Sequence, residues 1–385
     1  MITTNNAINN LQDTELPIGS LVYFSTGGPD STYMQNNWLK CDGSTYSQSA
    51  YPILFSRLGL INNNGVLWSS VSYTTNLSYR PTGLSYGNGS YVLSTSNAEI
   101  FTSTDHLSWS SQTVLPGTTV QTMTFGGGLF LVGKNNGFIQ TSTNGVSWSA
   151  SLQVTASGGN GYVAYANGLY FASFGSYLFT STNTSSWTLA FNFSGEIPYR
   201  VVYGAGLYAI ATNQDVYTAT TTTVWTNRTS TLTNQNLSDI AYGDNTFVAV
   251  GTGSGILKSV GGLSWEMATN TFTETSLFSA NVIYGNGIFI ANRSNGAIKT
   301  STNADTWYNS VTPTLTGNTQ TSYMGPLLYA NSTYFVGQTN NIWSSPDAYP
   351  YNPATQFQVP IDNQTSVFSE GVNAFPRSMY IRALT

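Results

Sequence analysis

The chain has 385 residues, of which only 7% are Asp, Glu, Lys or Arg, while 40% are hydrophobic and 14% aromatic. Its 25 Tyr, 19 Phe and 9 Trp can bury enough apolar area to offset the entropy of ordering, which excludes general disorder. The net charge of −5, without a Lys/Arg cluster, argues against nucleic acid or anionic lipid as partners. A single cysteine, Cys41, and a single histidine, His106, argue against a disulfide framework and against Cys- or His-based metal sites. We expect no cofactor and no metal.

The N-terminal residues resemble neither a signal peptide nor a membrane span. The chain begins Met1-Ile2-Thr3-Thr4, and no stretch approaches roughly eighteen apolar residues. We therefore expect a protein that is made in the cytoplasm and is not inserted into a membrane.

Three elements are predicted in residues 1–61. The apolar run at 16–24 predicts a strand, and Asp42-Gly43 predicts a tight turn just after Cys41, which we expect to be a small packed hydrophobe. Residues 51–59 predict a short amphipathic helix, because its apolar side chains share one face. Those side chains are Tyr51, Leu54, Phe55 and Leu58.

A repeat of about forty residues fills residues 62–353. Its most regular anchor is a tryptophan, found at Trp68, Trp109, Trp148, Trp187, Trp225, Trp265 and Trp307. Each repeat also holds an aromatic residue followed by a Gly/Asn-rich turn, as in Tyr86-Gly87-Asn88-Gly89, which predicts a hairpin. Gly126-Gly127-Gly128 is one of these hairpins and not a phosphate loop, because no helix or Lys follows in Walker spacing.

Two further strands follow each hairpin. An aliphatic residue about nine positions before the tryptophan marks the third strand, and the tryptophan opens the fourth. The turn between them reads Ser-x-Asp/Asn-x-x-x-Trp and resembles the Asp box of sialidase-like propellers, one residue shorter than is usual there. The copies pair Asp105 with Trp109, Asn144 with Trp148, Asn183 with Trp187, and Asn303 with Trp307.

The Asp-box residues are expected to be structural. A short Asp or Asn side chain can cap backbone N–H groups of the turn, while the tryptophan packs against a neighbouring repeat. The motif is incomplete in the repeats around Thr221 and Gly261. His106 occupies a turn position in one copy, and we expect it to be solvent-exposed and without a role.

Four short strands repeated seven times predict an all-β fold, a seven-bladed β-propeller, with a solenoid as the alternative. Residues 64–68 favour the closed ring, because they copy residues 144–148 yet lack three preceding strands. The last repeat ends near Asp347 without its tryptophan. We predict that this N-terminal strand completes the last blade. Pairing of residues 66–72 with the first blade would disprove that closure.

The segments outside the repeats, 1–61 and 354–385, together resemble the phage tail-collar family. The resemblance rests on the strand at 16–24, the run at 37–44 and the helix at 51–59, and it covers about ninety residues. The family's Phe-x-Leu-Pro-Asp element normally follows that helix, whereas here Phe357-Gln358-Val359-Pro360 lies 298 residues after Gly59 (357 − 59). The propeller therefore looks inserted into a small α+β module. Ile361-Asp362 departs from the family, and residues 379–383 are a candidate closing strand.

The insertion also orients the propeller. The chain enters before a fourth strand and leaves after a third, so both connections lie on the face that carries the Asp-box turns and hairpins. We expect the collar-like module against this face, which leaves the opposite face free for binding. The free face carries the second-to-third-strand loops, such as those around Asn97, Lys134, Ser176 and Gln214. Glu196, Tyr199 and Arg200 fall in one connection near the start of a first strand and are the candidate ligand-binding residues of its central mouth, with a solvated loop as the alternative.

The resemblance implies a bacteriophage virion protein of the tail-fibre or collar type. Such proteins join other tail proteins, commonly as trimers, and we expect the free face to bind a host-cell receptor, a glycan, because Ser, Thr, Asn and Tyr suit hydroxyl-bearing ligands. A structural spacer or decoration protein is the alternative. A glycosidase is disfavoured, since it needs paired carboxylates, and we expect no catalytic residues. The arginines of the repeats share no common phase: Arg80, Arg200, Arg228 and Arg293.

Overall fold

The computed structural model describes residues 21–24, 38–40, 45–47, 69–70, 77, 79–117, 119–229, 236–253, 255–269, 271–272, 280–293, 296–309, 324–338, 341–345, 356–358 and 378–382. The chain divides into two compact units, one made of residues 1–65 and 351–385 and the other of residues 66–350. Within the described ranges the only helical element is a 3-10 turn, η1 (Asn135–Gly137), and no helix there could cross a membrane. The predicted helix at 51–59, the Asp42-Gly43 turn and Cys41 lie outside the described residues.

The smaller unit joins the two ends of the chain in shared sheets. Strand β33 (Ser378–Arg382) lies between β1 (Leu21–Phe24) and β2 (Trp38–Lys40) and is antiparallel to both. A second pair joins β3 (Thr45–Ser47) to β32 (Gln356–Gln358). The predicted closing strand near the C-terminus is confirmed, and it is the central strand of its sheet. The whole propeller sequence lies between the strands that pair.

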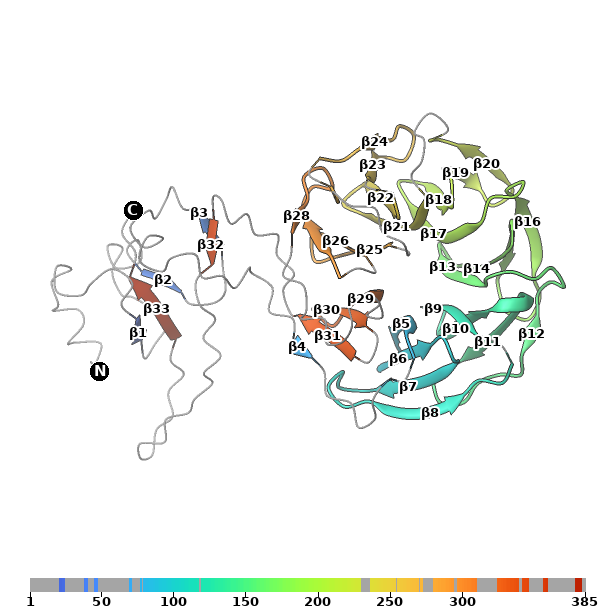
Figure 1. Ribbon diagram of the computed structural model, residues 1–385, viewed down its shortest axis with the longest axis horizontal. Coiled ribbons are helices and arrows are strands. Elements are labelled where there is room, and N and C mark those ends of the chain that lie inside the picture. The colour runs from blue at the N-terminus through green and yellow to red at the C-terminus, as the bar shows by residue number, and fades with distance from the viewer. Residues whose placement is uncertain are drawn as a thin grey trace. The chain divides into compact units, whose positions relative to one another are not determined.

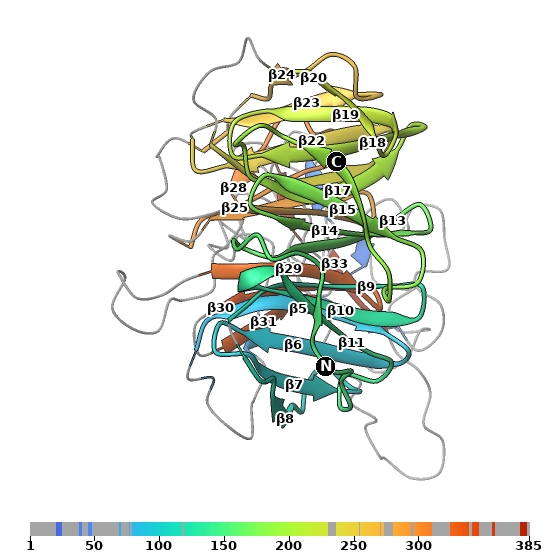
Figure 2. The same ribbon diagram turned by 90° about the vertical axis from the view of Figure 1, so that its right-hand side faces the viewer.

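The larger unit is a ring of seven four-stranded antiparallel sheets (Figure 1), which confirms the predicted propeller. The first strands surround the axis: β5 (Pro81–Gly87), β9 (Val120–Gly126), β13 (Tyr162–Ala166), β17 (Pro198–Gly204), β21 (Leu237–Gly243), β25 (Ala280–Gly285) and β29 (Met324–Ala330). The second strands are β6 (Ser90–Thr95), β10 (Leu129–Lys134), β14 (Leu169–Phe174), β18 (Leu207–Thr212), β22 (Thr246–Gly251), β26 (Ile288–Arg293) and β30 (Thr333–Gln338). Figure 2 shows the ring from its side, with the strands of successive blades above one another.

The third and fourth strands form the outer part of each blade. The third strands are β7 (Glu99–Ser103), β11 (Phe138–Ser142), β15 (Tyr177–Ser181), β19 (Val216–Thr221), β23 (Ile256–Val260), β27 (Ile298–Ser301) and β31 (Asn341–Ser345). The fourth strands are β8 (Ser110–Val114), β12 (Leu152–Gln153), β16 (Thr188–Asn192), β20 (Val224–Asn227), β24 (Glu266–Met267), β28 (Tyr308–Asn309) and, from the start of the chain, β4 (Ser69–Ser70).

The ring is closed by strand exchange, as predicted. Strand β4 pairs antiparallel with β31, with Ser70 opposite Trp343 and Ser69 opposite Ser344. The last blade thus takes its outer strand from residues that precede the first blade. Closure of this kind joins the start of the propeller sequence to its last blade, so that the two ends of the propeller sequence are held in one sheet.

Neighbouring blades meet at the hairpin end of the inner strands. In every blade the aromatic residue before the hairpin packs on the aromatic residue after it, with ring centroids 4.5 to 4.8 Å apart. The glycine that follows the first aromatic lies under the ring of the next blade. A Cβ added to Gly243 would lie 2.0 Å from the Tyr284 ring, and the same overlap arises at Gly87, Gly126, Gly204 and Gly285. The ring of the next blade therefore occupies the space that a side chain would need.

Two blades carry alanine at this position. Ala330 belongs to the same buried cluster as Tyr86, which packs the last blade on the first. Ala166 precedes the blade of Tyr203, whose side chain is 37% exposed. An alanine is thus accommodated at two of the seven positions.

The outer turns are held by their Asp or Asn residues. Oδ1 of Asp105 accepts hydrogen bonds from the backbone N–H of Leu107 at 2.9 Å and of Ser108 at 2.8 Å, and from Oγ of Ser103 at 3.0 Å. The side-chain oxygens of the three asparagines accept the matching backbone pairs at 2.9 to 3.1 Å. They are Asn144, Asn183 and Asn303.

Each Asp-box tryptophan is tied to its own turn and packs inward. The indole N–H of Trp109 donates to the carbonyl of His106 at 3.0 Å, and Trp148, Trp187 and Trp307 make the equivalent bond at 3.0 Å. The bond survives in the two degenerate repeats, from Trp225 and Trp265 at 2.9 and 3.1 Å. Loss of the capping residue in those repeats therefore leaves the tryptophan in place.

Two side chains differ from expectation. His106 is half-buried and not solvent-exposed, because its ring packs 5.7 Å from Tyr91 and 5.4 Å from Phe335. Lys134 ends a second strand as expected, but its side chain is buried and its Nζ donates to the carbonyl of Pro116 at 2.5 Å. Burial lowers the pKa of Lys134. The Lys134 side chain is therefore not displayed to solvent, and the His106 ring is partly covered.

Gly243→Ala should destabilise the ring, because the new methyl group would overlap the Tyr284 ring. We expect the free energy of unfolding to fall by about 1–3 kcal/mol, the usual cost of overpacking. The reverse change in another blade, Ala166→Gly, adds no atom and should cost less than about 1 kcal/mol. Denaturant titration measures both. Equal losses in the two variants would refute the steric explanation.

Asp105→Asn should remove a pH dependence while keeping the turn. Hydrogen bonds from Ser108, Ser103 and Leu107 lower the pKa of Asp105 from 3.8 to about 2. Stability from this charged acceptor is therefore present above pH 3.8 and lost as the pH falls to about 2. The difference in unfolding free energy between wild type and variant should shrink over that interval. As a control, Asn144→Ala should cost about 1 kcal/mol at every pH.

Candidate functional site

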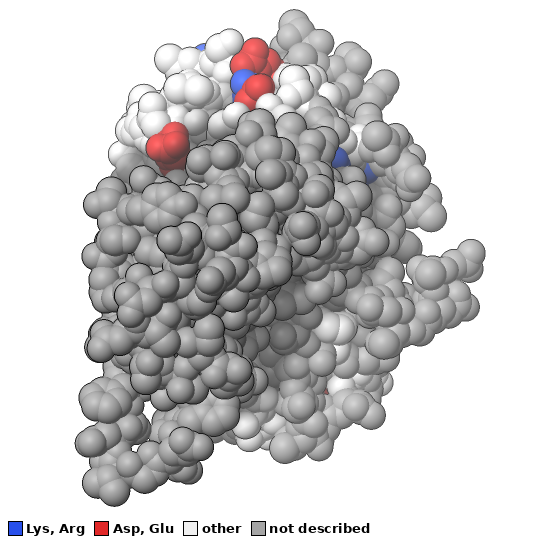
Figure 3. All heavy atoms as spheres, turned by 90° about the vertical axis from the view of Figure 1, so that its left-hand side faces the viewer, with Lys and Arg blue, Asp and Glu red and all other residues white. Residues whose placement is uncertain are grey.

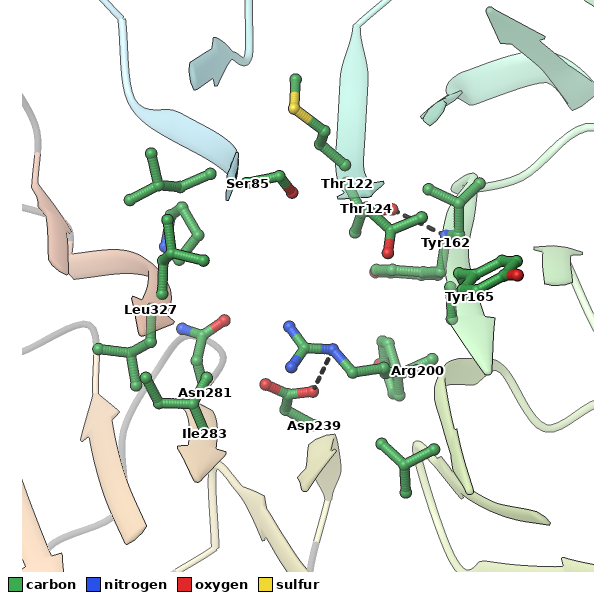
Figure 4. Close-up of a pocket in the computed structure, with 18 of the residues that line it drawn as sticks. Ser85, Thr122, Thr124, Tyr162, Tyr165, Arg200, Asp239, Asn281, Ile283 and Leu327 are labelled. Carbon is green, nitrogen blue, oxygen red and sulfur yellow. Dashed lines mark hydrogen bonds and ion pairs between the residues drawn. The ribbon is translucent and has the colours of Figure 1, made fainter. Parts of the chain in front are cut away.

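A cavity of about 780 Å³ runs along the propeller axis and is lined by the first strands of all seven blades. Every first strand runs toward its hairpin, so residues early in these strands lie near one face of the ring and residues late in them near the other. The two ends of the cavity consequently receive different side chains. Figure 4 shows the inner strands and the side chains they direct toward the axis.

The hairpin end is aromatic. Each blade contributes one ring there: Tyr86, Phe125, Tyr165, Tyr203, Tyr242, Tyr284 and Tyr329. These are the rings that rest on the glycine or alanine of the preceding blade. They are held by the repeat itself, so this end is nearly the same in all seven blades.

The opposite end is polar and departs from the repeat. Arg200, early in β17, bonds through Nε to Oδ1 of Asp239 on β21 at 3.2 Å (Figure 4). The arginine side chain is 39% exposed and the aspartate side chain 5%. Asp239 also accepts the backbone N–H of Ile240 at 2.9 Å and of Val282 at 3.0 Å. Its carboxylate therefore links three consecutive blades.

Burial dominates the electrostatics of Asp239. Burial raises the pKa of Asp239, while Arg200 and the N–H groups of Val282 and Ile240 oppose that rise. The ion pair thus offsets part of the cost of placing a carboxylate inside the ring.

Neutral polar side chains around this pair are also fixed by neighbouring blades. Nδ2 of Asn281 donates to Oδ1 of Asn292 at 3.1 Å and to the carbonyl of Gly325 at 3.2 Å. Figure 4 shows the remaining amide oxygen of Asn281 on the cavity side. Thr122 acts similarly, since its Oγ1 accepts the Val163 N–H at 2.9 Å. The polar end is therefore a rigid surface.

Two tyrosines complete it. The rings of Tyr162 and Tyr199 meet edge to face with centroids 4.8 Å apart. Burial raises the pKa of Tyr199, so its hydroxyl stays protonated at neutral pH and can donate a hydrogen bond.

The structure separates the three residues singled out in the sequence. Tyr199 and Arg200 line the cavity, but Glu196 does not. Its carboxylate accepts hydrogen bonds from Oγ1 of Thr212 at 2.5 Å and from the hydroxyl of Tyr217 at 2.7 Å. Burial and Glu196 together raise the pKa of Tyr217. Glu196 thus holds two strands of its own blade.

The sequence alone did not identify three of the residues that line the cavity, Asp239, Asn281 and Tyr162. Each lies within the first three residues of an inner strand, and that position was the available signal. Polar residues at the start of a strand can be assigned to the propeller axis only when the order of the strands within the blade is known.

Charge in the cavity is sparse. Among its described lining residues the charged side chains are Arg80, Arg200 and Asp239, so Asp239 is the one carboxylate. A two-carboxylate glycosidase site is not formed by these residues. No group of three or more His, Cys, Asp or Glu side chains that could hold a metal occurs within the described part of the chain. The face drawn in Figure 3 likewise shows few charged side chains among its described atoms.

Arg200→Gln should destabilise the fold at neutral pH and not in acid. The pKa of Asp239 is already raised above 3.8, and losing Arg200 raises it further. Below the unfolded pKa both proteins hold a neutral Asp239, and as pH rises the variant loses more stability. We expect a deficit of about 1 kcal/mol at pH 7, discounted for the exposure of Arg200. Urea titrations from about pH 3 to 8 measure it. In an Asp239→Asn background the deficit should lose its pH dependence.

Comparison with known proteins agrees with the two-part architecture. Residues 19–65 match the family described as Phage Tail Collar Domain, which confirms the resemblance of this segment. The match suggests a phage tail protein that associates with other tail proteins in the virion. No curated protein sequence matches the chain.

Solved structures resemble the propeller alone. A streptogramin B lyase is 12% identical, with a TM-score of 0.62, covering 73% of this chain and 97% of the lyase. A virginiamycin B lyase from Staphylococcus aureus with quinupristin, in a form made catalytically inactive by a histidine-to-alanine change, is 11% identical, with a TM-score of 0.63 and coverages of 73% and 99%. YCF48 from Cyanidioschyzon merolae is 13% identical, with a TM-score of 0.55 and coverages of 72% and 98%. At these identities the likeness is one of fold.

Proposed function

We propose that this chain is a receptor-binding protein of a phage tail. Its collar-like unit attaches to other tail proteins as a homo-oligomer, a trimer, and its propeller binds a glycan on the host surface without chemical conversion. The observation that carries the proposal is the polar end of the axial cavity, where Tyr199, Arg200 and Asn281 stand on a rigid scaffold.

Topology supports a display role for that end. Strand β4 starts at Ser69 and β31 ends at Ser345, so both chain connections of the propeller leave on the hairpin face. The polar end of the cavity lies toward the other face. The two strand ends through which the chain enters and leaves the propeller are therefore at the opposite end of the ring from the polar end of the cavity.

The chemistry of the polar end suits a sugar. Sugars present hydroxyl groups and a flatter apolar face, which neutral donors and aromatic rings recognise together. The hydroxyl of Tyr199 and the amide oxygen of Asn281 offer a donor and an acceptor. The Tyr162–Tyr199 pair offers aromatic surface at the same place.

Binding without catalysis is the simplest role for these groups. The lyase mentioned above is described as catalytically inactive when a histidine is replaced by alanine. The single histidine of this chain, His106, packs against Tyr91 and Phe335 and is not among the residues that line the cavity. Asp239 is the one carboxylate among the described residues that line the cavity.

Binding of the full-length chain to host bacteria tests the proposal. Fluorescently labelled wild-type protein should bind the cells, and Tyr199→Ala should reduce binding about tenfold or more by removing the aromatic surface. Leu263→Ser is the matched control, because Leu263 is 61% exposed on an outer turn. This variant should bind as the wild type does. Absence of wild-type binding would support a spacer or decoration protein instead.

A further inference from the structure

We infer that the polar end of the cavity recognises a carboxylate group, and that the glycan bound there is acidic. The inference rests on the proposed receptor-binding function and names the chemical class of its ligand. Its centre is Arg200, whose side chain reaches from β17 into the cavity (Figure 4).

The geometry leaves one edge of the Arg200 guanidinium facing the cavity. Nε lies 3.2 Å from Oδ1 of Asp239, and Figure 4 shows the two terminal nitrogens at the end of the side chain that is farthest from β17. These two nitrogens form a planar fork. The fork matches the two oxygens of a carboxylate, which it binds through two parallel hydrogen bonds.

Arg200 is also oriented before any ligand arrives. Asp239 is fixed by the backbone N–H groups of Ile240 and Val282, and its charge attracts the guanidinium, whose Nε lies 3.2 Å from Oδ1. Little side-chain entropy is then lost on binding, so more of the interaction contributes to affinity. Because Asp239 and Arg200 lie on different blades, the ring itself sets the direction of the fork.

The charge balance of the cavity favours an anion. Its described lining holds two arginines, Arg80 and Arg200, and one carboxylate, that of Asp239. The chain as a whole carries a net charge of −5. A local positive site on a negative protein attracts an anionic group selectively. One planar fork corresponds to a planar carboxylate, such as that of a uronic acid, more closely than to a tetrahedral phosphate.

The test compares native host cells with cells whose surface carboxylates have been converted to neutral amides by a carbodiimide and an amine. Wild-type binding should fall about tenfold or more on the amidated cells. Arg200→Gln should bind native cells as weakly as the wild type binds amidated ones. Arg228→Gln is the matched control: Arg228 bonds through Nε to Thr218 at 2.8 Å and does not line the cavity, so its loss should change nothing.

Competition identifies the anion. Galacturonate should inhibit wild-type binding at concentrations where galactose, which lacks only the carboxylate, does not. Inorganic phosphate should be no better than galactose, and stronger inhibition by phosphate would overturn the assignment to a carboxylate. If Arg200→Gln fails to fold, Arg200→Lys keeps the charge without the fork and should still lose most of the preference.

The outcomes separate this inference from the proposed function. Wild-type binding that survives amidation, or that Arg200→Gln retains in full, overturns the carboxylate site and leaves receptor binding standing. Failure of the wild type to bind native cells removes the proposed function itself.

Discussion

The contact that the propeller depends on is the packing of each hairpin aromatic against the small residue of the preceding blade. Gly243 under Tyr284 shows its tightness, since even a methyl group would overlap the ring. Because this contact recurs at almost every junction, it sets a constant spacing between the inner strands. These contacts and the exchanged strand β4 close the ring. The cavity along the axis is what remains inside.

A scaffold built from equal repeats can carry a specific site only where the repeat is broken. At the hairpin end every blade contributes an aromatic ring, and that end is uniform. At the other end Arg200, Asp239 and Asn281 come from three consecutive blades, and each is bonded to a neighbour. The ring thus fixes the positions of these three residues, which no other blade repeats.

Structural and candidate recognition roles are divided between the two sides of each blade. The polar groups of the outer turns form hydrogen bonds within the same turn, as those of Asp105 and Trp109 do. Glu196 is close in sequence to the cavity residues Tyr199 and Arg200, but its carboxylate accepts hydrogen bonds from Thr212 and Tyr217. The polar side chains that line the cavity, such as Arg200 and Asn281, lie near the start of the first strands.

Sequence by itself determined the repeat, the number of blades, the closing strand and the collar-like ends, because these follow from the spacing of tryptophans, turns and apolar residues along the chain. It also brought forward Tyr199 and Arg200. Only the tertiary structure showed that Asp239, 39 residues beyond Arg200 (239 − 200), completes the pair, and that Glu196 turns away. Residues a repeat apart meet only through the rotation from one blade to the next. Their hydrogen bonds therefore depend on register and burial, which no local pattern encodes.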